Sequence, residues 1–381
     1  EKWNGSAWTE VGDLNTARLQ PGGAGTSSSA ALAFGGLGGS TYLSATEQYN
    51  GTSWTELNNL NTARFAVGAA GSTTAGLAYA GSIPGGDTQA TEEWNTGNAV
   101  GAWATGGNLN TARDQLAGAG TQTSALAAGG SPGASPGVLA VTESYNGSSW
   151  TEVNDLNTAR RLVAGTGAIG TQALAVSGWL NPGQATQVES WNGTSWTETG
   201  DVNTGRYSGA CAGTYTNSLF FGGTAPGDSA LTESWNGSAW TEVADLNTAR
   251  SGLAGTGVDN TSCLASAGGN STGALVFVES WNGSSWTEVA DLNTARYDLT
   301  GSGTQTASLI FGGTPPVTGA TELWNGSSWS EQNDLSTARV KLAGSSLSST
   351  SALAFGGNSP ATAATEEWSG QTFTTKTVST D

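Results

Sequence analysis

Short apolar segments alternate with polar turns along the whole chain, and one unit of this alternation contains four of them. After Arg113, the segments 116–121, 123–128, 141–145 and 148–153 are rich in Ala, Val, Thr and aromatic residues. Segments of this length and composition, bounded by Gly, Asn and Ser, predict β-strands. The first segment has little side-chain bulk, which is typical of an innermost strand crowded around a central axis.

Glycines predict where these strands end. The second predicted strand runs into a Gly-Gly pair, such as Gly129-Gly130, where a positive φ is expected. The third and fourth are joined by Asn-Gly, as at Asn146-Gly147. This dipeptide predicts a tight hairpin with a type I′ turn, in which both central residues have positive φ. The aromatic residues that flank the turn, such as Trp281 and Trp286, are expected to form a core between adjacent units.

The four-strand pattern recurs eight times, each time after the motif Asn-Thr-Ala-Arg or a close variant. Successive repeat arginines are 43 to 49 residues apart; they are Arg18, Arg64, Arg113, Arg160, Arg206, Arg250, Arg296 and Arg339. A period in the forties suits a four-stranded propeller blade and excludes the shorter leucine-rich, ankyrin and tetratricopeptide repeats. Helical repeats of similar length are disfavoured because the units are full of Thr, Ser, Gly and Asn.

The order Gly-Gly, aromatic, Trp, Leu-x-Thr-x-Arg is similar to the kelch repeat, and it covers essentially the whole chain. The interval from Trp3 to Trp8 is shorter than is usual in that family, which implies a tighter hairpin. The amino-acid sequence of segments 279–289 and 291–296 also resembles that of kelch-type structural proteins of marine bacteriophages. These resemblances imply an all-β fold, one β-propeller over residues 1–381 with about eight four-stranded blades, or alternatively seven.

Closure of such a ring is not resolved by the repeat count. Nine aromatic hairpins are present, including the first, between Trp3 and Trp8, and a degenerate last one, between Trp368 and Phe373. Only eight inner strand pairs accompany them. We therefore expect one terminal hairpin to complete the last blade and the other to be surplus, so that residues 1–18 supply a closing or surplus hairpin.

Composition and charge exclude several classes of function. The net charge is −18, and the 12 basic residues form no basic stripe, so nucleic acid is not an expected partner. Apolar runs such as 174–176 fall far short of the ~20 residues of a membrane-spanning helix, and no membrane insertion is expected. Because Glu1 is not Met, we expect it to follow a cleavage site or an upstream segment.

The residue types needed for most enzyme chemistry are missing or symmetric. The absence of histidine excludes His-dependent triads and zinc sites, and the copper site of galactose oxidase, which the kelch resemblance raises. No cofactor and no metal are expected. The acidic pairs Glu92-Glu93 and Glu366-Glu367 occupy a repeated position, which disfavours acid–base catalysis. Cys211 and Cys263 are expected to be free, packed thiols, with a disulfide between them as the alternative.

The repeat arginines have two interpretations. They could surround the axis as an anion-binding annulus. We favour a structural role, in which each arginine forms an inter-strand ion pair with a repeat carboxylate such as Asp291 or Glu279 and fixes one blade to the next.

Variation between repeats gives the best functional signal. The connections after the second strand and those that carry the repeat arginine are expected on one face of the ring, and the Asn-Gly turns on the other. The first class differs from repeat to repeat: 37–45, 82–90, 131–140, 179–187, 224–231, 270–278 and 314–320. We predict a ligand-binding face there, with neutral drift as the alternative. Its candidate residues are Tyr42, Leu43, Ile83, Asp87, Leu139, Trp179, Leu180, Asp228, Phe277 and Val317. One Asn-Gly hairpin, 95–103, is lengthened on the opposite face.

The sequence thus favours a non-catalytic structural or adhesive protein at a virion surface or outside the cell. Its expected partners are a host surface glycan or protein, or a neighbouring virion protein. A purely architectural spacer is the alternative, and a carbohydrate-active enzyme is a weaker one.

Overall fold

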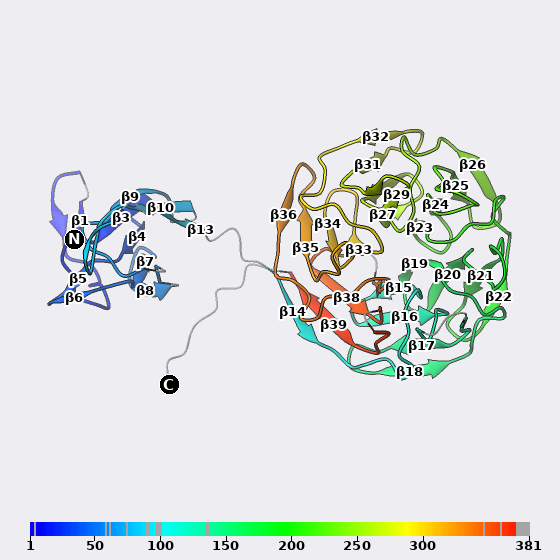
Figure 1. Cartoon of the computed structure of the whole chain (residues 1–381). Helices are drawn as coiled ribbons and strands as arrows, with labels where there is room; N and C mark the ends of the chain where they lie inside the picture. Colours follow the sequence, from blue (N-terminus) through cyan, green and yellow to red (C-terminus); the bar gives the residue numbers. More distant parts are fainter. Residues whose placement is uncertain are drawn as a thin grey trace. The chain divides into compact units, whose positions relative to one another are not determined.

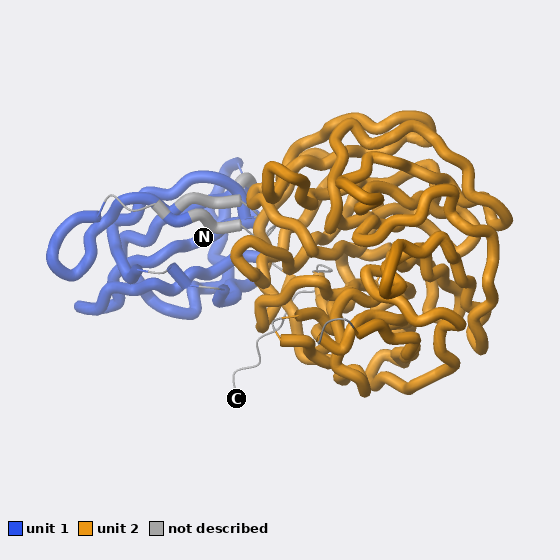
Figure 2. Tube along the Cα trace, turned by 45° about the vertical axis from the view of Figure 1, so that its right-hand side comes forward, with its two compact units in different colours: residues 1–99 blue, residues 100–381 orange. Residues whose placement is uncertain are grey.

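The computed structural model describes residues 1–370 except 4, 58, 61, 74, 89–90, 96–100, 134–136, 346 and 359. All regular elements within these residues are β-strands, arranged as repeated antiparallel sheets (Figure 1). One large sheet follows each of the eight repeat arginines, as the repeat count predicts. The sheets belong to two compact units, Glu1–Ala99 and Val100–Asp381 (Figure 2).

The second unit contains five sheets built from one repeat each. Their strands follow one another in sequence from the inner to the outer edge: β15 (Ala117–Thr121), β16 (Ser124–Ala128), β17 (Thr142–Tyr145) and β18 (Trp150–Val153); β19 (Ala164–Ile169), β20 (Gln172–Val176), β21 (Val188–Trp191) and β22 (Trp196–Glu198); β23 (Ala210–Gly213), β24 (Ser218–Phe221), β25 (Thr232–Trp235) and β26 (Trp240–Val243); β27 (Ala254–Asp259), β28 (Ser262–Ser266), β31 (Val278–Trp281) and β32 (Trp286–Glu288); β33 (Thr300–Gly303), β34 (Ser308–Phe311), β35 (Thr321–Trp324) and β36 (Trp329–Glu331). The strands predicted after Arg113 match β15 to β18 closely.

The sixth sheet is assembled from both ends of this unit. Its strands are β14 (Ala102–Thr105), β39 (Thr365–Ser369), β38 (Ser351–Phe355) and β37 (Ala343–Gly344), in that order from the outer edge. Strand β14 lies antiparallel to β39, with Trp103 opposite Trp368. The inner strand β15 contacts both β19 and β37, so the six sheets close into a ring.

A continuous circle of backbone hydrogen bonds confirms the closure. The residue two positions after each repeat arginine donates its N–H to the carbonyl of the corresponding residue in the preceding sheet. The six bonds, of 2.8–3.3 Å, run from Gln115 to Lys341, from Lys341 to Asp298, from Asp298 to Gly252, from Gly252 to Ser208, from Ser208 to Leu162 and from Leu162 back to Gln115. All six residues have φ between 54° and 60°. Because only glycine adopts this region without strain, five side chains are held there by the surrounding contacts.

The first unit contains two sheets of the same kind. One is β3 (Gly22–Ser27), β4 (Ala30–Phe34), β7 (Thr46–Tyr49) and β8 (Trp54–Leu57); the other has only β9 (Gly68–Gly71), β10 (Ala75–Tyr79) and β13 (Thr91–Asn95). By repeat position, β14 would be the fourth strand of this second sheet, but it pairs with β39 in the ring. Small hairpins complete the strands of the chain: β1 (Lys2–Trp3) with β2 (Trp8–Thr9), β5 (Leu37–Gly38) with β6 (Thr41–Tyr42), β11 (Ser82–Ile83) with β12 (Gly86–Asp87), and β29 (Gly269–Asn270) with β30 (Gly273–Ala274).

The eight large sheets agree with the expected count of about eight blades; six of them form the ring and two lie in the first unit. Near the chain ends, β1 and β2 pair with each other, and β14 supplies the outer strand of the sheet that contains β39. Phe373, in the last predicted hairpin, lies outside the described residues. In sequence, segment 95–103 between β13 and β14 is longer than the Asn-Gly turns of the other repeats.

The Asn-Gly turns also differ from the predicted type I′. Only the glycine has positive φ, for example 93° at Gly147. The Asn146 side-chain carbonyl accepts the backbone N–H groups of Ser148 and Ser149, at 3.0 Å each. This side-chain capping stabilises the turn without a positive φ at the asparagine. The predicted positive φ of the paired glycines is confirmed, at 66° for Gly129 and 109° for Gly130.

The core lies between neighbouring sheets, as predicted for the aromatic residues. Trp281 and Trp286 are buried together with Phe221 of the preceding sheet, whose ring centroid is 5.0 Å from that of Trp286. The Trp286 indole Nε1–H also donates to Oγ1 of Thr232 in that sheet, at 3.2 Å. Cys211 and Cys263 are free and buried, so the disulfide alternative is excluded.

The repeat arginines are buried ion-pair partners and do not form an anion-binding annulus. The Arg250 backbone bonds to Ser229 and Gly223 of one sheet, while its guanidinium bonds to Glu279 of the next, at 2.5 Å. All eight arginines form the equivalent pair, each with a side chain that is at most 2% exposed. Burial lowers the pKa of the Arg250 guanidinium, and Glu279 opposes that shift. The favoured structural interpretation is confirmed; the partner is Glu279 and not Asp291.

Candidate binding face

The variable connections lie on the same face as the arginine-bearing connections. In six repeats, the residue after the repeat arginine forms an isolated β-bridge with the first residue of a variable connection, as Tyr207 does with Thr224. In several repeats, the arginine itself donates its backbone N–H into a variable connection, as from Arg160 to the Leu139 carbonyl at 3.1 Å. These connections are therefore anchored to a rigid scaffold, which is the usual setting for recognition loops.

The ten predicted site residues divide between the two units. Tyr42, Leu43, Ile83 and Asp87 belong to the first unit, and the other six belong to the ring. Asp87, Asp228 and Val317 are exposed, and the remaining seven are half-buried. Residues 89–90 and 134–136 of two predicted connections lie outside the described residues. The structure therefore does not place all ten candidates on a single surface.

Several of these residues serve the scaffold. The Leu139 N–H bonds to the Gly130 carbonyl, and Leu43 makes the same contact with Gly36, each at 2.9 Å. The Phe277 carbonyl accepts the Ala267 N–H at 2.8 Å. These backbone bonds close the loop ends at Leu43, Leu139 and Phe277, whose side chains are half-buried.

Tyr207, a residue that the sequence reasoning did not single out, links Trp179 to the connection that carries Asp228. The rings of Trp179 and Tyr207 meet edge to face, with centroids 5.1 Å apart. Tyr207 exchanges two backbone bonds with Thr224, which in turn bridges to Asp228. Asp228 Oδ1 accepts a hydrogen bond from the Ser251 hydroxyl at 3.1 Å. Two half-buried aromatic rings and an exposed carboxylate thus span three adjacent sheets, and we call Trp179, Tyr207, Thr224, Asp228 and Ser251 the aromatic platform.

Gly252, next to Ser251 of the platform, accepts the backbone N–H of Asp298, which belongs to a polar cluster at the axis. Asp298 and Lys341 form an ion pair of 3.8 Å between neighbouring sheets. Burial raises the pKa of the Asp298 carboxyl, Lys341 lowers it, and Asp114 raises it further. The pair of residues after the repeat arginine is different in each of the six ring repeats, although Tyr comes first in two of them and Asn-Thr-Ala-Arg before the pair is nearly constant. This contrast was the available sequence signal for Tyr207, Asp298 and Lys341.

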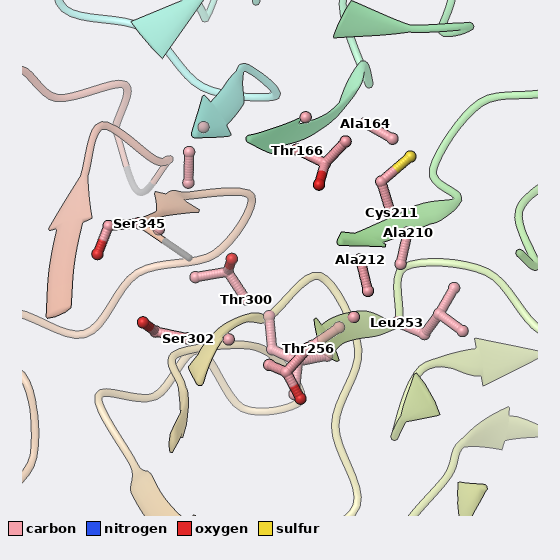
Figure 3. Close-up of a pocket in the computed structure, with 18 of the residues that line it drawn as sticks. Ala164, Thr166, Ala210, Cys211, Ala212, Leu253, Thr256, Thr300, Ser302 and Ser345 are labelled. Atoms are coloured by element: carbon pink, nitrogen blue, oxygen red, sulfur yellow. The ribbon is translucent and has the colours of Figure 1, made fainter. Parts of the chain in front are cut away.

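The axial cavity of the ring has a volume of about 130 Å³ (Figure 3). Its lining consists of Gly, Ala, Val, Leu, Ser, Thr and Cys211. The hydroxyls of Thr166 and Ser302 donate to backbone carbonyls, at 2.6 Å each. Burial raises the pKa of the Cys211 thiol, which keeps it protonated at neutral pH. The described lining therefore offers no group that would act as an acid or base near pH 7.

Charge is distributed unevenly between interior and surface. Eight of the twelve basic residues belong to the buried ion pairs, whereas only eight of the 30 acidic residues do. The surface is consequently strongly acidic, which opposes the approach of anionic ligands. Within the described residues, no group of three or more potential metal ligands occurs, and no helix is long and apolar enough to cross a membrane.

No protein-family model matches the chain, and no curated protein is significantly similar to it.

Proposed function

We propose that the protein is a non-catalytic binding module that recognises a neutral glycan on a host surface through the aromatic platform of its ring. The pairing of Trp179 with Tyr207 on the variable face carries this proposal. Aromatic rings offer an apolar surface to the C–H groups of a sugar, and an adjacent carboxylate accepts hydrogen bonds from its hydroxyls. The acidic surface favours neutral over anionic sugars.

The kelch-like repeat, and the resemblance of its sequence to phage structural proteins, support the proposal that the protein is a component of a virion surface. A rigid scaffold with variable connections suits the adhesive part of such a particle. A neighbouring virion protein or a host surface protein is the corresponding protein partner on the same face.

Glycan-array screening of the full chain tests this function. Trp179→Ala and Tyr207→Ala are expected to weaken binding to the recognised neutral glycan at least about tenfold, since one well-packed aromatic contact contributes about 1.4 kcal/mol or more. Trp8→Ala is the matched control, because Trp8 is an exposed tryptophan of the first unit. The proposal fails if no glycan binds, or if the platform variants bind as well as the control.

A second candidate is an architectural role, in which copies of the chain assemble with one another. The exposure of large apolar side chains on the first unit favours it, and these residues lead to a separate inference.

A further inference from the structure

The first unit exposes Tyr79 at a position that is buried in the ring repeats. Tyr79 occupies the last position of β10, where other repeats have Phe221, Phe311 and Phe355. These phenylalanines are fully buried, whereas Tyr79 is 42% exposed. In the ring, each phenylalanine packs against a tryptophan of the following sheet, as Phe355 does against Trp150 at 4.9 Å. Tyr79 has no following sheet within its own unit.

Among the described residues of the first unit, no large sheet precedes the one that carries Tyr49. The Tyr49 hydroxyl is buried without a hydrogen-bond partner among the described residues. Its counterpart in the ring, Tyr145, donates to Glu367 Oε1 of the preceding sheet at 2.5 Å. Trp54 is half-buried, whereas its counterpart Trp150 is buried. This face therefore carries a polar group that a preceding sheet would satisfy, as the preceding sheet does for Tyr145.

The two faces are the two sides of one repeated interface. In the ring, each interface joins a preceding sheet to a following one. By repeat position, the sheet with Tyr79 matches the preceding partner of such an interface, and the sheet with Tyr49 matches the following partner. In sequence, the Glu-Glu pair of the sheet before Tyr145 recurs at Glu92-Glu93, in the repeat that carries Tyr79. A second copy of the unit is thus the occupant with matching chemistry for either face.

The ring fixes how many copies are needed. Ala66 N–H donates to the Gln20 carbonyl at 3.0 Å, the same link that joins neighbouring sheets around the ring axis. Six such steps close the ring, so one step turns the chain by a sixth of a circle and a unit of two sheets spans a third. A head-to-tail interface closes when its rotation completes the circle. We propose that three copies of Glu1–Ala99 assemble head to tail into a second ring of six sheets, with Tyr79 of each copy packed against the Tyr49 and Trp54 face of the next.

The mass of the full chain in solution tests this inference. Light scattering coupled to size-exclusion chromatography is expected to give three times the 38.1 kDa chain mass. Tyr79→Asp is expected to shift the protein to the single-chain mass. Ile169→Asp is the matched control, because Ile169 is 44% exposed on the ring and its substitution leaves the trimer intact.

A single-chain or two-chain mass for the unaltered protein overturns the inference, including the case in which one chain covers both of its own faces. A trimer that survives Tyr79→Asp overturns the assigned interface. Far-ultraviolet circular dichroism of Tyr79→Asp identifies loss of the fold, and Tyr79→Ser then repeats the mass measurement with a milder change.

Discussion

The indole Nε1–H of Trp103 donates a hydrogen bond to Oγ1 of Thr321, at 3.1 Å, across 218 residues of sequence. The same bond joins Trp196 to Thr142, from one sheet of the ring to the preceding one. By repeat position, the partner of Trp103 would be Thr46 in the first unit. The Thr46 hydroxyl is instead buried without a partner among the described residues. Strand β14 thus completes the ring and leaves an unsatisfied group in the first unit.

This difference predicts opposite effects of one substitution at two repeat positions. Thr142→Val removes an acceptor for the Trp196 indole and should destabilise the ring by about 1–3 kcal/mol, because a buried donor is left unpaired. Thr46→Val removes a hydroxyl that has no partner and should be neutral or stabilising. Urea unfolding of both variants measures the two changes in free energy. Equal destabilisation would show that Thr46 does have a partner.

Trp103 is expected to contribute much more to stability than another tryptophan of the same repeat position. Trp103 packs against Phe311, with centroids 4.8 Å apart, and against Trp368, at 5.3 Å. Trp103→Ala should therefore cost about 2–4 kcal/mol of unfolding free energy. Trp8→Ala, at a position that is 64% exposed, should change it by less than about 0.5 kcal/mol. Similar values for both variants would argue against the closing role of β14.

The buried pair of Arg250 and Glu279 should behave as one unit. Glu279→Gln leaves a buried guanidinium without its counter-charge, and a cost of about 3–5 kcal/mol is expected. Arg250→Met combined with Glu279→Gln should cost less than the sum of the two single changes. Glu288→Gln, at an exposed position of β32, is the control and should have little effect. Strict additivity in the double-mutant cycle would contradict the coupling.

The two buried thiols predict a loss of stability in alkaline solution. Burial raises the pKa of both Cys211 and Cys263 above the ordinary value of 9.0. The folded state therefore keeps these protons while the unfolded state releases them. Their contribution is fully present below pH 9 and decreases as the pH rises further, by up to about 1.4 kcal/mol per pH unit for each thiol.

Urea unfolding between pH 7 and pH 10 measures this slope. The variant that combines Cys211→Ala and Cys263→Ala should show a shallower decrease than the unaltered chain. Identical slopes for the two proteins would exclude the thiols as its cause.

Local features of the fold were predictable because the residues that produce them recur in each of the eight repeats. The Gly-Gly strand ends, the aromatic core between sheets and the role of Arg250 follow from residue type and position alone. The closing strand was not predictable, because Trp103 has the same repeat position whether β14 pairs with β13 or with β39. In sequence, only the longer turn before Trp103 distinguishes this repeat from the others. The effect of that turn depends on competition between two distant strand edges, which a repeat alignment does not contain.

The candidate site was predicted less completely than the fold. Trp179 and Asp228 stood out as apolar or charged residues in variable connections. Tyr207 follows a constant motif directly, so its variability was overshadowed by the arginine before it. Its part in the platform arises from a bridge between sheets, which no single repeat reveals.

The pairing of β14 with β39 is the central claim, and a disulfide across the two strands tests it most directly. Ala102 lies opposite Ser369 in the register of this pair. In a chain with Cys211→Ala and Cys263→Ala, the combined substitutions Ala102→Cys and Ser369→Cys should form an intramolecular disulfide on mild oxidation, detected by peptide mass spectrometry. A folded protein in which these two thiols stay reduced, or cross-link only between chains, would contradict the ring of six sheets.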